Sequence, residues 1–264
     1  MLREVLEKLA KGQISLDDAE KLLRILAIEE IGNLARIDIG RESVKGIPEI
    51  ILAEGKRSED VAEIALRMLN ENGRAIISRA TREQLEIIRE ATPVAAFLQV
   101  NNRASMAVIK KKNFETKKTG GKVGILTAGT SDISVAEEAK VVVEEMGCEV
   151  ITAYDTGIAG IHRLFPPLKE MIGRDVDVVI VVAGREGALP SVVAGLVDLP
   201  IIAVPTSVGY GFGEKGVSAL MAMLQACSLG LAVVNIDGGV AAGAVAALIA
   251  NRVAKFKNRA EGRS

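Results

Sequence analysis

The fold of this chain is constrained most by short, almost wholly apolar runs that each lead into a glycine-containing turn and a helical pattern. These runs cover residues 176–183, 200–207 and 231–236. They are short and rich in β-branched residues, and their lack of alternation is typical of strands covered on both faces. Parallel strands joined by helices hold ligands in the loops beyond their carboxyl ends. The sequence therefore predicts a parallel α/β sheet with its site in those loops.

The same alternation begins earlier, at Lys122. Residues 122–127 and 149–154 have strand character, and residues 133–146 between them have a helical pattern. We therefore predict that residues 122–264 form a flavodoxin-like three-layer α/β/α sandwich with a parallel sheet. Within it, Pro166 and Pro167 should break a helix. The helix from Val217 should carry Cys227 near its end.

Residues 1–112 lack this regular order and predict a small α+β domain. Residues 113–121, rich in lysine and glycine, predict a solvated linker. In the front domain we expect a helix over 16–28, a polar turn over 41–48, and a helix from residue 59 capped by Ser58.

The composition excludes several classes of partner. The 33 basic and 34 acidic residues nearly cancel, so the chain has no electrostatic footprint for nucleic acid. No apolar run approaches the roughly 18–20 residues that span a bilayer, and we expect no membrane association. The charged start is unlike a signal peptide. Two cysteines, Cys148 and Cys227, do not make a disulfide framework, so we expect a reduced, cytoplasmic protein.

Candidate binding residues follow the first two strands of the sandwich. Ser131 and Asp132 stand where a strand meets a helix amino end, which favours an anion, and Asp132 suits a ribose hydroxyl. The alternative is that one of them only caps the helix. His162 and Arg163 follow the second strand, where a lone histidine is more often a helix-start residue than a catalyst.

Further candidates follow the later strands. Glu186, between Arg185 and Gly187, is a carboxylate directly after a buried strand, and its alternative role is an ion pair with Arg185 or a neighbour. The other candidate binding residues after these strands are Gly184, Ser207, Gly209, Gly211 and Asp237. The glycine series suits either an approaching phosphate or a mobile turn. From the residues alone, we interpret Cys148 and Cys227 as packed, unreactive side chains. No pattern typical of an all-protein metal site is present.

From residue 122 onward the chain resembles the aminoimidazole ribonucleotide carboxylase/mutase (PurE-type) family of purine synthesis. Gly129–Asp132 approximates that family's Gly-Ser-x-Ser-Asp turn, and Ile161–Arg163 its Ala-His-Arg. Arg185–Ser191 corresponds to its Gly-Ala-Ala-His-Leu-Pro-Gly turn, which puts Ala188 where the catalytic histidine of that family stands. This departure argues against ordinary purine carboxylase activity.

Over its whole length the chain resembles the LarB family of nickel-pincer cofactor biosynthesis proteins. The matching stretches are Ala35–Asp38, Arg41, Gly46–Ile50, Gly55–Lys56, Ala183–Val192, Pro205–Gly211, Cys227 and Val234–Asp237. The resemblance implies carboxylation of the pyridinium ring of nicotinic acid adenine dinucleotide by CO2 or bicarbonate, with hydrolysis of its phosphoanhydride. The products would be pyridinium-3,5-biscarboxylic acid mononucleotide and AMP. It also implies that Cys227 adds to the ring and that Glu186 belongs to the active site.

The resemblance sets further expectations. No tightly bound cofactor is expected, although the hydrolysis could use Mg2+, and the PurE-type domain implies a homo-oligomer, an octamer in that family. Charged residues of the front domain suit phosphates and ribose hydroxyls, or simply form a solvated surface; they are Arg36, Asp38, Arg41, Lys45 and Lys56. Two alternatives stay open: a PurE-type carboxylase/mutase, and a non-catalytic nucleotide-binding protein.

Overall fold

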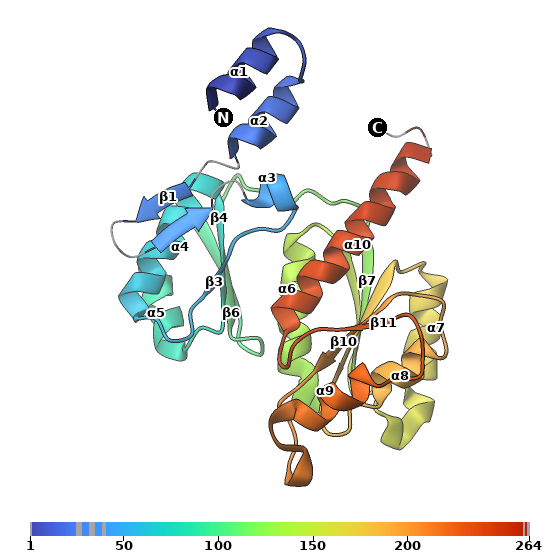
Figure 1. Cartoon of the computed structure of the whole chain (residues 1–264). Coiled ribbons are helices and arrows are strands. Elements are labelled where there is room, and N and C mark those ends of the chain that lie inside the picture. The colour runs from blue at the N-terminus through green and yellow to red at the C-terminus, as the bar shows by residue number, and fades with distance from the viewer. Residues whose placement is uncertain (1, 25–27, 32–34, 39–40, 261, 263–264) are drawn as a thin grey trace. The chain divides into compact units, whose positions relative to one another are not determined.

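A computed structural model describes the chain except for residues 1, 25–27, 32–34, 39–40, 261 and 263–264 (Figure 1). The chain forms two compact units. Unit 1 comprises Met1–Val100 and Ser105–Glu115, and unit 2 comprises Asn101–Ala104 and Thr116–Ser264. The tip of one hairpin, at residues 101–104, therefore groups with the second unit rather than with the strands on either side of it.

Unit 1 is built on a four-stranded mixed sheet in the order β3–β4–β6–β5. The strands are β3 (Ile50–Leu52), β4 (Arg74–Ser78), β5 (Ala96–Asn101) and β6 (Met106–Lys111). The helices α4 (Ser58–Asn72) and α5 (Arg82–Ala91) pack together, and their buried aliphatic side chains form one core with β4 and β6. The remaining elements are α1 (Leu2–Ala10), α2 (Leu16–Arg24), β1 (Ile28–Ile31), β2 (Ala35–Asp38) and α3 (Arg41–Lys45).

Three expectations for this unit were wrong in detail. Ile28 does not end a helix but begins β1, because it pairs with Asp38 in an antiparallel ladder that local periodicity cannot report. Residues 41–45 of the expected polar turn form the short helix α3. Ser58 is already inside α4, and Arg57 holds the cap position without a side-chain hydrogen bond.

Unit 2 contains a five-stranded sheet in the order β11–β10–β9–β7–β8. Every pairing in it is parallel, which confirms the predicted flavodoxin-like class. The strands are β7 (Lys122–Thr127), β8 (Glu149–Ala153), β9 (Val178–Ala183), β10 (Ile201–Pro205) and β11 (Leu231–Val233). All residues of β9 and β10 are buried, as their unbroken apolar sequences predict.

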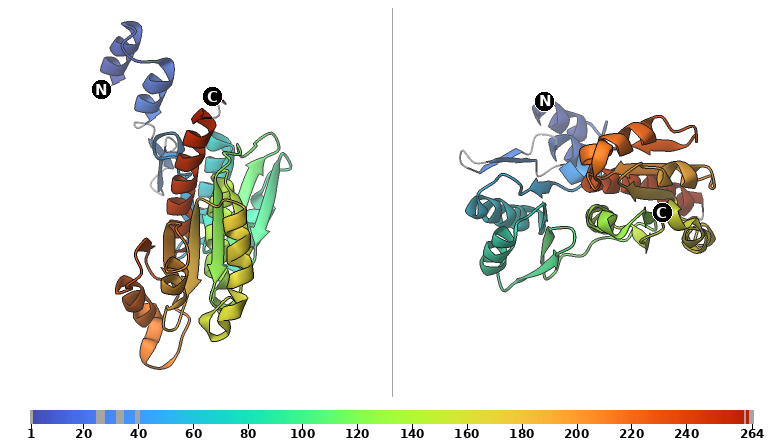
Figure 2. Two further views of the ribbon diagram at one scale, coloured as in Figure 1. Left: turned by 90° about the vertical axis from the view of Figure 1, so that its right-hand side faces the viewer. Right: turned by 90° about the horizontal axis from the view of Figure 1, so that it is seen from below.

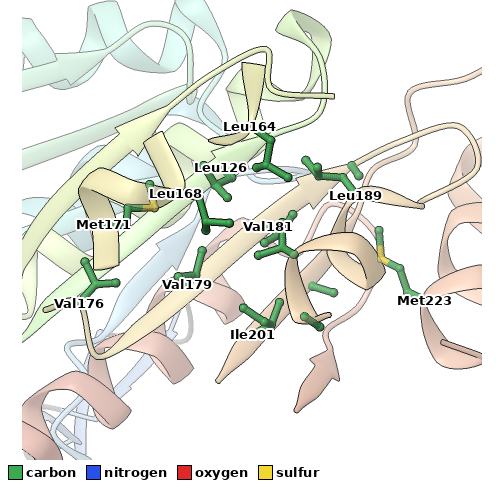
Figure 3. Close-up of a cluster of buried hydrophobic side chains, with 14 of the residues drawn as sticks. Leu126, Leu164, Leu168, Met171, Val176, Val179, Val181, Leu189, Ile201 and Met223 are labelled. Atoms are coloured by element: carbon green, nitrogen blue, oxygen red, sulfur yellow. The ribbon is translucent and has the colours of Figure 1, made fainter. Parts of the chain in front are cut away.

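Helices cover both faces of this sheet (Figure 2). They are α6 (Ile133–Glu145), α7 (Phe165–Gly173), α8 (Leu189–Ala194), α9 (Val217–Leu224) and α10 (Gly239–Ala260). The 3-10 turns are η1 (Thr130–Asp132), η2 (Ile158–Arg163) and η3 (Gly211–Gly216). Side chains of α7, α8 and α9 form a core with one face of β9 and β10 (Figure 3). On the other face, α6 and α10 pack against each other and against the sheet.

Two expectations for this unit also need correction. Pro166 and Pro167 do not break a helix but begin α7, because the first turn of a helix has no intrahelical partner for the N–H that proline lacks. Cys227 is not in α9, which ends at Leu224, but in the segment that leads into β11.

Helix α10 passes a length and composition test for crossing a membrane, alone among the helices that the structure describes. Its glycine and alanine side nevertheless packs against α6. A Cβ atom on Gly239 would lie 2.3 Å from the carbonyl oxygen of Val135, and one on Gly243 would lie 2.6 Å from that of Ala139. These contacts make α10 a core helix of unit 2.

The close approach of α6 and α10 gives the first prediction. The substitution Gly243→Ala should lower the free energy of unfolding by about 1–3 kcal/mol, because the new methyl group meets backbone that cannot move alone. Gly173→Ala is the matched control, since a Cβ atom there meets nothing within 4 Å. Urea denaturation of both variants measures the effect, and equal stabilities would show that the two helices can separate at little cost.

Candidate active site

A cavity of about 250 Å³ opens at the carboxyl ends of the strands in unit 2. It is lined by the loops after β7, β8, β9 and β10, as expected for a parallel sheet of this kind. The predicted site residues that line it are Ser131, Asp132, Arg163, Gly184, Arg185 and Glu186. These residues are far apart in sequence and come together only because their strands end at one edge of the sheet.

Asp132 links three of these loops by accepting hydrogen bonds from them. One carboxylate oxygen accepts a hydrogen bond from the Gly129 N–H at 2.9 Å, and the other accepts one from the Thr206 hydroxyl at 2.7 Å. The Gly184 N–H also contributes. The side chain is only 4% exposed, and this burial raises the pKa of Asp132, although the hydrogen bonds oppose the shift. Asp132 is therefore first of all a structural carboxylate in the cavity wall.

Two glycines let the loops approach this closely. A Cβ atom on Gly184 would lie 2.4 Å from the carbonyl oxygen of Val208 and 2.6 Å from the hydroxyl of Thr206. One on Gly157 would lie 2.5 Å from the carbonyl oxygen of Ala128. Any side chain at either position would push apart loops that line the cavity.

Glu186 lies in the cavity wall with an exposed carboxylate. In the part of the chain that the structure describes, no residue forms an ion pair or hydrogen bond with it. The alternative ion pair with Arg185 is not formed. The Arg185 guanidinium instead donates to the Tyr210 hydroxyl at 2.9 Å and lies 4.7 Å from the centre of that ring. Glu186 is thus free to act on a ligand as a base or an acceptor.

Arg163 also borders the cavity, but its charge is paired. Its guanidinium donates to Asp155 at 2.5 Å, and Asp155 itself lines the cavity. The neighbouring His162 is exposed in η2 and lies outside the lining. The loop after β8 therefore presents an arginine–carboxylate pair to a ligand rather than an imidazole.

The remaining candidates of unit 2 lie outside the cavity. Ser207 and Asp237 bind each other, because the Ser207 N–H donates to the Asp237 carboxylate at 2.8 Å and so links the ends of β10 and β11. Gly209 and Gly211 continue the loop beyond Val208, which itself lines the cavity. Burial raises the pKa of Cys148 to about 11, as expected for a packing thiol.

Cys227 is exposed and is not among the residues that line the cavity. The neighbouring Ser228 donates to the carbonyl oxygen of Ser191 in α8 at 2.8 Å. Three residues further on, the Gly230 carbonyl accepts from the Ile201 N–H, at the amino end of β10. The thiol therefore lies in the loop between α9 and β11, which leads to the amino ends of the strands.

Two of the charged candidate residues of unit 1 have hydrogen-bond partners within that unit. Arg41 donates to Glu49 at 2.6 Å, and Lys56 donates to the Leu52 carbonyl at 2.7 Å. Lys45 is exposed at the end of α3. Arg36 and Asp38 lie on β2, and their side chains fall outside the described residues.

Several residues that shape the cavity were not predicted from the sequence. Thr206 donates to Asp132, Asp155 accepts from Arg163, and Tyr210 accepts from Arg185. Asp155 and Tyr210 follow runs that were predicted as strands, and Thr206 lies near the end of such a run, so their places in the sequence were a usable signal. What the sequence could not show was which pairs of loops would meet.

Comparison with known proteins identifies the two parts of the chain. Residues 28–112 match the LarB/PurE-like N-terminal domain. Residues 122–261 match AIR carboxylase. The chain belongs to the AIR carboxylase family. The chain is accordingly a carboxylase/mutase-type enzyme, and its front domain is of the LarB/PurE-like kind.

Similar proteins match this chain over different shares of its length. The chain is 49% identical over 251 residues to an uncharacterised protein of Methanocaldococcus jannaschii, covering 94% of this chain and 96% of that protein. It is 30% identical over 151 residues to the N5-carboxyaminoimidazole ribonucleotide mutase of Thermotoga maritima, covering 52% of this chain and 84% of the mutase. The mutase of M. jannaschii is 35% identical over 118 residues, covering 44% and 69%.

The buried Asp132 of this AIR carboxylase family member gives a prediction about pH. Its pKa is raised in the folded state, so ionisation is harder in the folded than in the unfolded protein. The free energy of unfolding should therefore fall, relative to that of Asp132→Asn, as the pH rises from about 4 through the raised pKa. Urea denaturation of both proteins at steps between about pH 4 and pH 8 measures the difference. A difference independent of pH would mean that the carboxylate is as well solvated in the fold as in water.

Proposed function

We propose that this protein carboxylates the pyridinium ring of nicotinic acid adenine dinucleotide with CO2 and hydrolyses its phosphoanhydride. The products are pyridinium-3,5-biscarboxylic acid mononucleotide and AMP, in the first step of nickel-pincer nucleotide cofactor synthesis. The observation that carries the proposal is the unpaired Glu186 carboxylate in the wall of a carboxylase-family cavity. Two residues along the same loop, Ala188 lines the cavity at the position where the resemblance to purine carboxylases leads us to expect histidine.

The relatives support a reaction outside purine synthesis. M. jannaschii has a mutase that is 35% identical to this chain over part of its length. The same organism has a separate protein that matches this chain almost from end to end at 49% identity. An organism that already has the mutase does not need a second, longer protein for the same step. The front domain, which matches the LarB/PurE-like N-terminal domain, points in the same direction.

The proposed carboxylation needs an electron source and a base. A pyridinium ring is an electrophile and cannot attack CO2 directly. Addition of the Cys227 thiolate gives a dihydropyridine whose ring carbon five is enamine-like, and this carbon forms the bond to CO2. Glu186 then takes the proton from that carbon, and the electron pair restores the aromatic ring as the thiolate leaves. In the hydrolytic half, water attacks the phosphoanhydride and AMP is the leaving group.

The position of Cys227 supports a particular assembly of the proposed site. The thiol is exposed and outside the cavity of its own protomer, whereas Glu186 lines that cavity. A ring held beside Glu186 therefore needs a thiol from elsewhere. The proposal accordingly includes a homo-oligomer in which Cys227 of one copy reaches the Glu186 cavity of another.

The hydrolytic half sets the expectation for metal. Within the described residues, no group of three or more His, Cys, Asp or Glu side chains is placed to hold an ion. A Mg2+ ion used in hydrolysis would therefore be held mainly by the phosphates of the substrate. Hydrolysis measured with and without EDTA tests this part of the proposal.

One experiment separates the proposed activity from its alternatives. The purified protein is incubated with nicotinic acid adenine dinucleotide and bicarbonate, and the products are identified by mass spectrometry. AMP together with a carboxylated mononucleotide supports the proposal. Turnover of carboxyaminoimidazole ribonucleotide instead would identify a purine carboxylase/mutase. Binding of the dinucleotide without any product would leave a nucleotide-binding protein.

The role of Glu186 predicts the behaviour of Glu186→Gln. Turnover should fall by about 100-fold or more, because an amide of the same shape cannot accept the ring proton. Substrate affinity should stay within about tenfold of the wild-type value. Steady-state kinetics and a denaturation curve measure both effects. Unchanged turnover with reduced stability would assign Glu186 a purely structural role.

Assembly of the site from two copies predicts a complementation result. Cys227→Ala and Glu186→Gln should each be inactive, whereas Cys148→Ala, the matched control, should keep wild-type turnover. Co-expressed subunits of the two inactive variants should regain about one quarter of wild-type turnover, because random pairing leaves one site in four intact. If thiol and carboxylate came from the same copy, every mixed site would lack one group and no activity would return.

A further inference from the structure

The glycine-rich loop Val208–Gly216 carries two of the few aromatic side chains in the protein. The chain has only five phenylalanines, two tyrosines and no tryptophan. Tyr210 is 78% exposed and Phe212 is 108% exposed, so the Phe212 ring makes essentially no contact with its own protomer. The flat faces of this ring are therefore open to a planar ligand that could stack on them.

The base of this loop is fixed to the cavity. Val208 lines the cavity, and its carbonyl oxygen accepts from the Arg185 N–H at 3.0 Å. Tyr210 accepts a hydrogen bond from the Arg185 guanidinium, and the Ser218 hydroxyl donates to the Arg185 carbonyl at 2.8 Å. Arg185 directly precedes Glu186, so the loop and the proposed base belong to one connected part of the cavity rim.

The far part of the loop is open. Gly211 has φ +75° and no atom within 4 Å of where a Cβ would lie, whereas Gly216 is packed, with its Cβ position 2.6 Å from the Thr206 carbonyl oxygen. Lys215 is exposed, and within the described part of the chain it has no ion-pair partner. Gly213 packs against Ser218, where a Cβ atom would lie 2.4 Å from the hydroxyl oxygen. The backbone of the loop is therefore supported on both sides of Phe212, whereas the Phe212 ring and the Lys215 ammonium group point to solvent.

The cavity is too small to enclose the whole of the proposed substrate. Sites for drug-sized ligands enclose about 300–1,000 Å³. The cavity here measures about 250 Å³, too little for both halves of a dinucleotide. With the pyridinium ring beside Glu186, the second nucleotide must extend over the rim.

We infer that the loop Val208–Gly216 binds the adenine nucleotide half of the substrate, with Phe212 stacking on the purine ring and Lys215 facing a phosphate. This assignment rests on the proposed function for the identity of the dinucleotide. Every base offers a flat face to an aromatic side chain, and losing one such stack weakens nucleotide binding by about tenfold or more. The base, not the phosphate alone, is what Phe212 recognises.

The absence of tryptophan gives a direct test. The substitution Phe212→Trp places the protein's single indole on the loop. AMP should quench its fluorescence in a saturable way, whereas ribose 5-phosphate, which lacks the base, should not. The control is Phe256→Trp, because Phe256 is 52% exposed on α10, near Lys257, which binds Asp177 just before the amino end of β9. AMP should leave that fluorescence unchanged.

A second pair of variants separates stacking from mere apolar contact. Calorimetric titration with AMP should show affinity reduced by about tenfold in Phe212→Leu and in Phe212→Ala, with Phe256→Ala like the wild type. AMP that binds the wild type and these variants equally would overturn the inference. So would an indole at position 212 whose emission is already that of a buried side chain before nucleotide is added, since a second copy would then cover it. AMP binding does not require turnover, so failure of the proposed carboxylation leaves both readouts intact.

Discussion

The cavity depends on the hydrogen bonds that a single buried carboxylate accepts. Asp132 is almost fully buried, and a buried charge is strongly unfavourable unless donors replace its lost hydration. The donors come from Gly129, Gly184 and Thr206, which belong to the ends of three different strand-following segments. Solvating one carboxylate therefore requires that these segments lie at fixed distances from one another. The shape of the cavity follows from that requirement before any ligand is bound.

The hydrogen-bond network around Asp132 is separate from the groups proposed to react. The Asp132 network and the close approach at Gly184 would hold the same loops whether position 188 were alanine or histidine. Glu186 makes no contribution to the network, since its carboxylate has no partner among the described residues. A carboxylase-family fold can thus exchange the residue that moves a proton without rebuilding the loops that position it. On such a fold, the function therefore depends on the exposed groups rather than on the hydrogen-bond network that holds the loops.

The sequence predicted the sandwich well because its strands are short apolar runs whose burial is decided locally. It predicted that Ser131, Arg163 and Glu186 would share one edge, since parallel strands bring their following loops together. It failed where a distant partner decides the outcome. Ile28 joins a strand because Asp38 pairs with it. Whether Arg185 pairs with Glu186 is left open by the sequence, and Arg185 donates instead to Tyr210 because another loop meets it there. Neither partner is visible in a local pattern.

Cys227 shows the same limit at the level of assembly. The helix before it exposes Val217, Met221 and Leu224, spaced so that they share one side, and Leu229 beyond it is also exposed. In sequence, such spacing is typical of the inward face of a helix. Cys227 is interpreted as packing because it is a lone cysteine among alanine, leucine and methionine. In the protomer the inward positions of α9 are instead Ala219 and Met223, which leaves an apolar side outward beside the thiol. Periodicity reports that a face is apolar, but not whether the chain's own core or another copy covers it. The proposal that Cys227 enters the site of a neighbouring copy would account for both the exposed apolar side and the exposed thiol.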